Sequence, residues 1–247
     1  MNRVRGWVSF LATLTAMAWL ALLALTPPGE AAAGAVQKAT AATPASGLQD
    51  DRGKFRAFLD GQPVGAEEFS IGRSGTEWVC RGTAEIQVPG SGSQTVSSVL
   101  HLSAEGNPVS YTWTAKGQKK AGGSANFSGS GARMDLQADG NPPFTQEFQF
   151  ESGRIVVLDN NLYHQYALLA RLYDWNAKGA QTFSVLIPQD LTPGVITVEW
   201  AGPLAMDGVK YDLLKVKSSD LLVELYVANG RLMRLVAPDS KVEVRRE

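Results

Sequence analysis

The chain has 247 residues, of which 44% are hydrophobic and 19% are charged, and its net charge is −1. This balance is typical of a chain that buries a core, and it excludes an intrinsically disordered polymer. The near-neutral charge gives nucleic acid no general reason to bind, so no nucleic-acid partner is expected. One Cys excludes a disulfide framework and a cysteine-built zinc site, and two His leave little room for a histidine metal cluster.

Residues 1–33 have the order of a secretory signal. Arg3 and Arg5 precede an apolar run over residues 8–25, and small Ala residues stand just before Gly34, where a signal peptidase would cleave. The apolar run is near the lower limit for spanning a bilayer, so an uncleaved membrane anchor is the alternative. We expect a cleaved signal and a periplasmic or secreted protein, which contacts the membrane only through this segment if it is uncleaved.

Residues 34–50 are rich in Ala, Thr, Ser and Pro and contain almost no large apolar side chain. Such a segment buries too little apolar surface to offset the entropy lost on ordering, so we predict a flexible linker. The remaining residues, 51–247, are predicted to form a single domain.

Apolar and polar residues alternate through most of this domain. Between Trp78 and Ile86, small or apolar residues hold one parity and mostly polar residues hold the other. Successive strand side chains point to opposite faces, so this pattern predicts half-buried strands. We predict a mainly β fold of about twelve strands in an antiparallel meander. The turn signals between the strands are Asp60-Gly61, 105–108, 139–142, Ser152-Gly153, Asp207-Gly208 and Asn229-Gly230.

Residues 161–178 break the alternation and contain no Gly or Pro. Asp159 or Asn160 is placed to cap the start of a helix here, and Gly179 stands just past its end. The helix, about residues 161–176, is apolar round most of its circumference, so we expect it to be buried against the sheet. The sheet must curl to protect its apolar face, which predicts an open or closed barrel. The residues at helical spacing are Leu162, Tyr166, Leu169 and Tyr173.

Catalytic and metal-binding motifs are not found in the sequence, so we predict no catalytic residue set, no metal site and no cofactor. His164 falls in the predicted helix. As a general base it would make the protein a hydrolase, and the alternative is a histidine that hydrogen-bonds at a helix–sheet contact. Paired carboxylates for glycoside hydrolysis are available, although nothing singles any of them out. They are Glu67, Glu68, Glu85, Glu199 and Glu224.

A sheet of this size encloses more volume than one short helix fills, so an apolar cavity is expected. The alternative for each aromatic residue is an ordinary place in the β core. The loop 188–193, stiffened by two prolines, is the expected rim. The basic turn 116–120 (KGQKK) suits an anionic partner, and its alternative is a solvated hairpin tip. The candidate cavity-lining residues are Trp78, Trp113, Phe127, Phe148, Tyr163, His164, Tyr166 and Trp200.

The signal, the linker and a large sheet with one embedded helix together resemble the half-barrel of periplasmic lipoprotein carriers. The closer likeness is to uncharacterised, signal-bearing bacterial proteins of that architecture. The resemblance covers nearly all of residues 54–247 and implies non-covalent binding of a lipid-like or other apolar molecule in the concave face. The alternatives are an envelope structural or protein-interaction domain with a solid core, and a hydrolase that uses His164. The stretches that carry the likeness are FRAFLDGQPVGAEEFSI, NLYHQYALLARLYDW, FSVLIPQDLTPGVITVEW and LYVANGRLMRLVAP.

Overall fold

The structure is a computed structural model that describes residues 47–247, apart from residues 89–91, 160, 190 and 220. The predicted signal, residues 1–33, and the linker up to residue 46 lie outside the described residues. Leu48, which falls in the predicted linker, is buried in the core, so the folded domain includes residues before 51.

Fifteen strands among the described residues form one sheet. We call the first eight the first wing and strands β10–β15 the second wing. The first wing comprises β1 (Asp51–Leu59), β2 (Gln62–Ser74), β3 (Glu77–Val88), β4 (Gly92–Leu102), β5 (Pro108–Lys116), β6 (Lys120–Ser128), β7 (Gly131–Ala138) and β8 (Phe144–Gln149). The remaining strands are β9 (Ile155–Val157), β10 (Ala180–Ile187), β11 (Thr192–Met206), β12 (Val209–Lys217), β13 (Leu222–Ala228), β14 (Arg231–Ala237) and β15 (Val242–Arg246).

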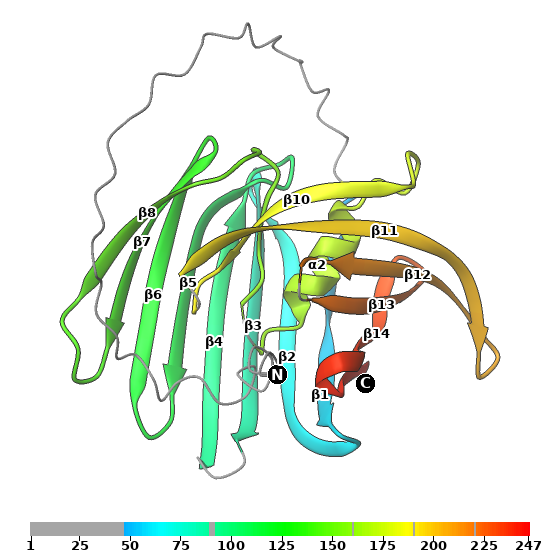
Figure 1. The fold of residues 1–247 in the computed structure, drawn as a ribbon, viewed down its shortest axis with the longest axis horizontal. Helices are drawn as coiled ribbons and strands as arrows, with labels where there is room; N and C mark the ends of the chain where they lie inside the picture. The colour runs from blue at the N-terminus through cyan, green and yellow to red at the C-terminus, as the bar shows by residue number, and fades with distance from the viewer. Residues whose placement is uncertain (1–46, 89–91, 160, 190, 220) are drawn as a thin grey trace, which may run out of the picture.

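The strand order is β8-β7-β6-β5-β4-β3-β2-β1-β15-β14-β13-β12-β11-β10-β9. Each wing is an antiparallel meander, and the wings join where β1 pairs with β15, with Phe55 opposite Arg246. β9 is the exception, because it pairs with β10 in parallel. The sheet is not closed into a barrel, since β8 and β9 end the order (Figure 1).

The predicted mainly β fold is confirmed, and the predicted count of about twelve strands is too low. The single meander is also wrong at β9. Ser152-Gly153 separates β8 from β9, which do not pair with each other, and β9 pairs with β10 in parallel. β14 and β15 pair as a meander predicts, although the 3₁₀ turn Pro238–Ser240 that joins them carries no glycine signal. Two-residue hairpins are confirmed where both turn residues have positive φ, at Asp60-Gly61, Asp207-Gly208 and Asn229-Gly230.

The helix α2 spans His164–Leu172, so the predicted range of about 161–176 is too long at both ends. At the start, Asn161 has a φ of 70°, a left-handed conformation that cannot continue a helix. At the end, Tyr173 turns to an extended backbone, and its hydroxyl donates to the carbonyl of Gly179 at 2.8 Å. The predicted cap at Asp159 is wrong, because the N-cap position is Tyr163 and makes no side-chain cap bond. The other predicted cap, Asn160, lies outside the described residues.

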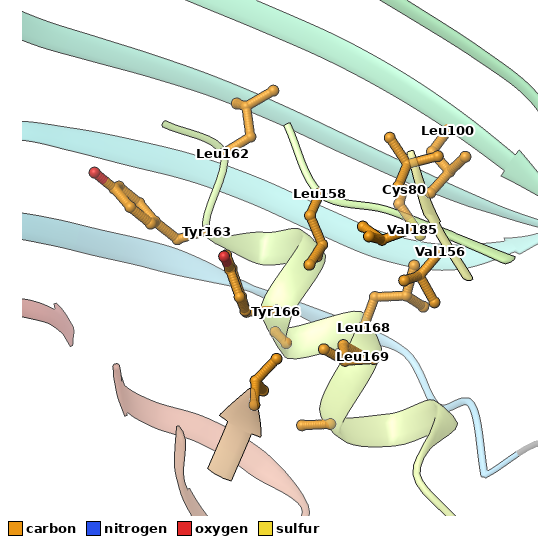
Figure 2. Packing of buried hydrophobic residues seen from close by; sticks show 14 of the residues in the cluster. Cys80, Leu100, Val156, Leu158, Leu162, Tyr163, Tyr166, Leu168, Leu169 and Val185 are labelled. Atoms are coloured by element: carbon orange, nitrogen blue, oxygen red, sulfur yellow. The ribbon is translucent and has the colours of Figure 1, made fainter. Parts of the chain in front are cut away.

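α2 lies between the two wings and packs against β2, β13 and β14 (Figure 1). Its apolar side chains belong to the same buried cluster as Cys80 and Leu100 of the first wing and Val185 of the second (Figure 2). Leu162 and Leu169 have no exposed surface, so the space around the helix is a packed core. No helix among the described residues combines the length and apolar character needed to cross a bilayer.

Candidate functional site

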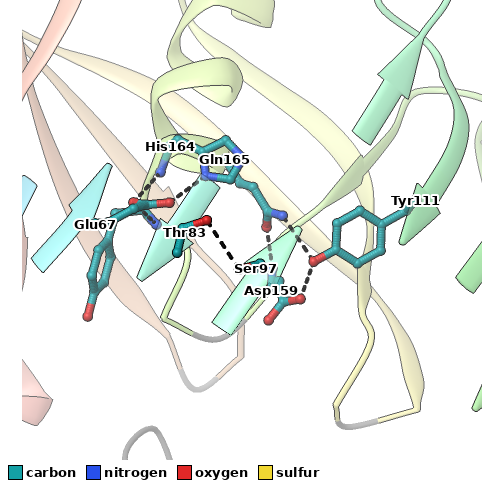
Figure 3. Close-up of polar contacts among 8 residues, drawn as sticks. Glu67, Thr83, Ser97, Tyr111, Asp159, His164 and Gln165 are labelled. Atoms are coloured by element: carbon teal, nitrogen blue, oxygen red, sulfur yellow. Dashed lines mark hydrogen bonds and ion pairs between the residues drawn. The ribbon is translucent and has the colours of Figure 1, made fainter. Parts of the chain in front are cut away.

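A buried carboxylate from the sheet holds the start of α2. Glu67 on β2 accepts hydrogen bonds at Oε2 from the backbone N–H groups of Tyr163 and His164, at 2.8 and 3.0 Å. Its Oε1 lies 2.5 Å from Nδ1 of His164 (Figure 3). Neither side chain has any exposed surface. Glu67 therefore takes the place of an N-cap residue, from a strand about one hundred positions earlier in the chain.

Two neighbouring residues of the sheet, Phe69 and Gly82, pack directly against this pair. Phe69 shares the inward parity of Glu67 and stacks on the imidazole, with ring centroids 6.2 Å apart. Gly82 on β3 lies against both partners, and a Cβ atom there would fall 2.5 Å from Nδ1 of His164 and 2.6 Å from Oε1 of Glu67. The close approach of helix and sheet therefore requires glycine at this position.

A second set of buried polar groups surrounds Asp159, just before α2. The carboxylate accepts hydrogen bonds from the hydroxyl of Tyr111 and from Nε2 of Gln189. Its backbone N–H donates to Oε1 of Gln165, whose Nε2 donates to the Tyr111 hydroxyl at 3.4 Å (Figure 3). Burial raises the pKa of Asp159 to about 7, against the opposing effect of these donors. Gln189 belongs to the predicted rim loop, which therefore turns inward; Asp190 of that loop lies outside the described residues.

Asp159→Asn is expected to remove a pH dependence of stability. In the folded protein the pKa of Asp159 is about 7, against an ordinary value of 3.8. The contribution of this side chain to the free energy of unfolding is therefore fully present below pH 3.8 and is lost as the pH rises to about 7. Asparagine does not titrate. The free energy of unfolding of the variant should therefore rise relative to wild type by roughly 2–4 kcal/mol between pH 4 and pH 8. Urea unfolding of both proteins at the two pH values measures this change. If the variant and wild type differ in free energy of unfolding by the same amount at pH 4 and pH 8, the prediction is contradicted.

A hydrolase that uses His164 needs a partner within hydrogen-bond reach, and Glu67 is such a partner. Nε2 of His164 is buried and has no hydrogen-bond partner among the described residues. Because the pair has no exposed surface, no substrate reaches it in this conformation. The contacts of Glu67 with Tyr163 and His164 are those of a structural link between the helix and the sheet. No group of three or more His, Cys, Asp or Glu side chains in the described part of the chain is placed to hold a metal ion.

A buried ionic cluster ties together the beginning and the end of the domain. Asp51 on β1 has no exposed side-chain surface and accepts two bonds from Arg246 on β15, at 2.6 and 3.1 Å. Arg171 of α2 lies 3.1 Å from the same carboxylate. Burial alone would raise the pKa of Asp51, but the two guanidinium groups outweigh it and the pKa is lowered. This cluster joins helix, first strand and last strand.

A hollow of about 910 Å³ lies away from this packed centre, over β5, β6, β7 and the turn that follows β7. Six of the eighteen described residues that line it have no side chain larger than a methyl group. Trp113 also lines it, and its indole Nε1 is buried without a hydrogen-bond partner among the described residues. Lys116 and Lys120 stand at one end, with threonines and carboxylates among the other lining residues. The small lining residues are Ala115, Ala121, Gly122, Gly123, Ala138 and Gly140.

The eight predicted lining residues are spread over the whole molecule. Of these, Trp113 lines the hollow. His164 joins Glu67, and Trp200 on β11 is half-buried, with its indole donating to Asp212 at 3.1 Å. Phe127 on β6 is partly buried against the core. The four that remain are buried in the core: Trp78, Phe148, Tyr163 and Tyr166.

Several residues of these sites were not singled out by the sequence analysis. Glu67 stood among five candidate carboxylates, yet it shares its parity with Phe69 and Ile71, a signal that it points inward. Asp51 likewise shares its parity with Phe55 and Ala57. The alanine and glycine lining of the hollow carries no comparable signal, because such residues are common in strands that face any packed core.

Comparison with known proteins supports the fold alone. No protein-family model and no curated protein sequence matches the chain. Among solved structures, the chain is similar to the beta-barrel-like protein of domain of unknown function DUF1849 from Brucella abortus. The TM-score is 0.53 and the sequence identity 7%, over 81% of this chain and 96% of that chain. The likeness shows a β-rich, barrel-like fold, and the resemblance to lipoprotein carriers stays a prediction.

Proposed function

We propose that this chain is a non-enzymatic binding protein that holds an apolar or amphipathic small molecule in the hollow over β5, β6 and β7. The observation that carries the proposal is the hollow itself, because its volume of about 910 Å³ falls within the range of ligand pockets. Alanine and glycine in the lining leave this space unfilled, whereas large buried side chains pack around α2.

A catalytic function has less support. The imidazole and carboxylate that would serve it, His164 and Glu67, are fully buried and are engaged in holding the helix. The hollow offers threonines, lysines and two carboxylates, but no His or Cys among the described residues lines it. A binding role needs only shape and a few polar groups.

We further propose that the protein acts in the periplasm or outside the cell. The charged, apolar and small-residue order of residues 1–33 supports this. The thiol of Cys80 fits the same setting, since it is fully buried and burial raises its pKa to about 12, which protects it from oxidation.

A second candidate is an envelope structural or protein-interaction domain. The solid packing around α2 favours it, and so does the edge strand β8, on which Phe144 is 45% exposed. A binding protein of this kind would recognise its partner on the surface, and the hollow would have no part in it.

Filling the hollow is expected to weaken binding of an uncharged apolar probe. Ala121→Trp places a large ring in the lining, so the fluorescence titration of 1-N-phenylnaphthylamine should give a Kd at least about tenfold higher than that of wild type. The measurement uses the full chain, freed of bound lipid by organic extraction and refolded. Mass spectrometry of the extract identifies any lipid that copurifies.

Ala205→Trp is the matched control, because Ala205 is an exposed alanine on β11 outside the hollow. This variant adds the same ring and keeps the same N-terminal segment. Any binding of the probe to that segment is therefore the same in both variants and does not affect their comparison. An equal Kd for the two variants, or no binding by wild type, would overturn the proposal. If wild type binds envelope proteins but does not bind the probe, the second candidate, a protein-interaction domain, would be favoured instead.

A further inference from the structure

We propose that the free edge of β8 pairs with the same edge of a second copy of this chain, antiparallel and about a two-fold axis. The sheet would then continue from one protomer into the next through a self-complementary contact. This dimer does not depend on occupation of the hollow. β8 ends the first wing, and β7 is its one strand partner in the described part of the chain (Figure 1).

The two ends of the sheet are protected differently. At one end, β9 has three residues, and all of them are buried. At the other end, β8 has six residues, FTQEFQ, with no Lys, no Pro and no register shift against β7. Shortness, burial, lysine, proline and bulges are the usual protection of an edge strand against pairing with another chain. β8 lacks these features, and Phe144 at its start is 45% exposed.

The register with β7 shows which backbone groups of β8 point outward. The N–H of Phe150 donates to the carbonyl of Ser130 at 2.8 Å. Hydrogen-bonded and non-hydrogen-bonded pairs alternate along an antiparallel ladder, so the even-numbered residues of β8 bind β7. Thr145, Glu147 and Gln149 therefore direct their N–H and C=O groups away from β7. Such a row is a template for a further strand.

The sequence of β8 is self-complementary when Gln146 lies opposite Gln146 of the second copy. In this register Thr145 lies opposite Glu147 of the second copy, and these outward residues exchange both of their backbone hydrogen bonds. Phe144 lies opposite Phe148 of the second copy in a non-hydrogen-bonded pair, where side chains come closer together. An aromatic pair of this kind stabilises a sheet and would cover the exposed ring of Phe144.

Charge favours the same register. With Glu147 on the two-fold axis, two carboxylates would face each other directly, which is unfavourable. With Gln146 on the axis, each Glu147 instead faces Thr145, and its Oε1 stays 3.8 Å from Nη1 of Arg133 in its own chain. A second copy of β8 therefore supplies both an aromatic partner for Phe144 and an uncharged neighbour for Glu147, and we assign the edge to it on these grounds.

Sedimentation equilibrium of the full chain tests the dimer with Glu147→Pro and its matched control Glu147→Ala. Both changes remove the same charge. Proline also removes an N–H that points away from β7, so it blocks the added strand without breaking the ladder to β7. We expect wild type and Glu147→Ala to form dimers, and the Kd of dimerisation of Glu147→Pro to be at least about tenfold higher than that of Glu147→Ala.

Cysteine cross-linking tests the register without proline, and so covers the case in which Glu147→Pro fails to fold. The Cα atoms of a non-hydrogen-bonded pair are about 4.5 Å apart, a separation that a disulfide can bridge. Gln146→Cys should therefore give a disulfide-linked dimer on oxidation with diamide. Thr145→Cys lies opposite Glu147 rather than itself, and should give at least about tenfold less. The native Cys80 is buried and common to both variants.

A wild type that stays monomeric at every concentration would overturn the proposal. Equal Kd values for Glu147→Pro and Glu147→Ala would also overturn it, because the copies would then associate through another surface, such as the N-terminal segment that all variants share. A monomer in which the N–H of Glu147 is slow to exchange with deuterium would assign the edge to another segment of the same chain and overturn the second copy as its partner. Equal cross-linking of the two cysteine variants would overturn the register.

Discussion

Replacing Gly82 with alanine is expected to lower the free energy of unfolding by about 3–5 kcal/mol. The new methyl group would push apart the buried pair Glu67 and His164. The Cβ atom would lie 2.5 Å from Cε1 and Nδ1 of His164 and 2.6 Å from Oε1 of Glu67. Both side chains are fully buried in the core, so neither moves aside cheaply. Displacing Glu67 also removes the acceptor for the first N–H groups of α2.

Gly72→Ala is the matched control for this prediction. Gly72 lies on the neighbouring strand β2, and a Cβ there has no contact closer than 3.8 Å, to Oδ1 of Asp50. Urea unfolding followed by tryptophan fluorescence should place this variant within about 0.5 kcal/mol of wild type. The double variant Gly82→Ala/His164→Ala should be less destabilised than the sum of its single changes, because the methyl group then has room. Equal losses for Gly82→Ala and Gly72→Ala would be inconsistent with the contact.

Arg246→Met is expected to cost about 3 kcal/mol, the second large effect, by leaving the buried carboxylate of Asp51 with Arg171 as its main partner. Methionine retains an apolar stem but removes the guanidinium, whose carbon lies 5.2 Å from the ring centroid of Phe69. The loss therefore comes from the hydrogen bonds to Asp51 and to the carbonyls of Arg52 and Leu232, together with this contact between guanidinium and ring.

Arg245→Met provides the comparison at the neighbouring position. Its side chain is 59% exposed and binds Glu243 at the surface, so its loss should cost much less stability than the loss of Arg246. The pKa of Asp51 is lowered in the folded protein, so its contribution is present above pH 3.8 and is lost as the pH falls through the lowered pKa. Arg246→Met removes the largest effect that lowers this pKa, so the variant should lose less stability than wild type on acid titration, and the difference between the two proteins should narrow as the pH falls below 3.8. Similar losses for the two variants at neutral pH would refute the role of Arg246.

Local features of the fold were predictable where one residue type dictates a backbone conformation. Asp60-Gly61 and Asn229-Gly230 form the expected hairpin turns because both positions have positive φ. The alternation from Trp78 to Ile86 appears as inward and outward faces of β3. The pairing of β1 with β15 was not predictable, since no turn connects them and residue pattern does not fix which distant strands meet.

The start of the helix and its polar contacts could not be predicted from sequence patterns. Periodicity indicated a helix, but its start depends on Glu67, which is distant in the sequence. Asp159 is a good cap residue by type, yet it lies outside the helix and is held by Tyr111 and Gln189. Tertiary contacts overrode local preference in both cases. The hollow depends on which small residues the register brings together, such as Ala115 opposite Ala121.

The meeting of β1 with β15 also bears on how the chain reaches its native state. The hydrogen bond from the N–H of Glu247 to the carbonyl of Lys54 joins residues at opposite ends of the domain. Closing so long a loop costs more entropy than forming either meander, so the two halves are expected to assemble first and to dock late. During synthesis, β1 has no partner on that side until the last residues emerge. A nascent chain that stops short of Val242 would leave Asp51 without Arg246, and a ribosome-bound series of lengths would show docking of the two halves only after residues 242–246 have emerged.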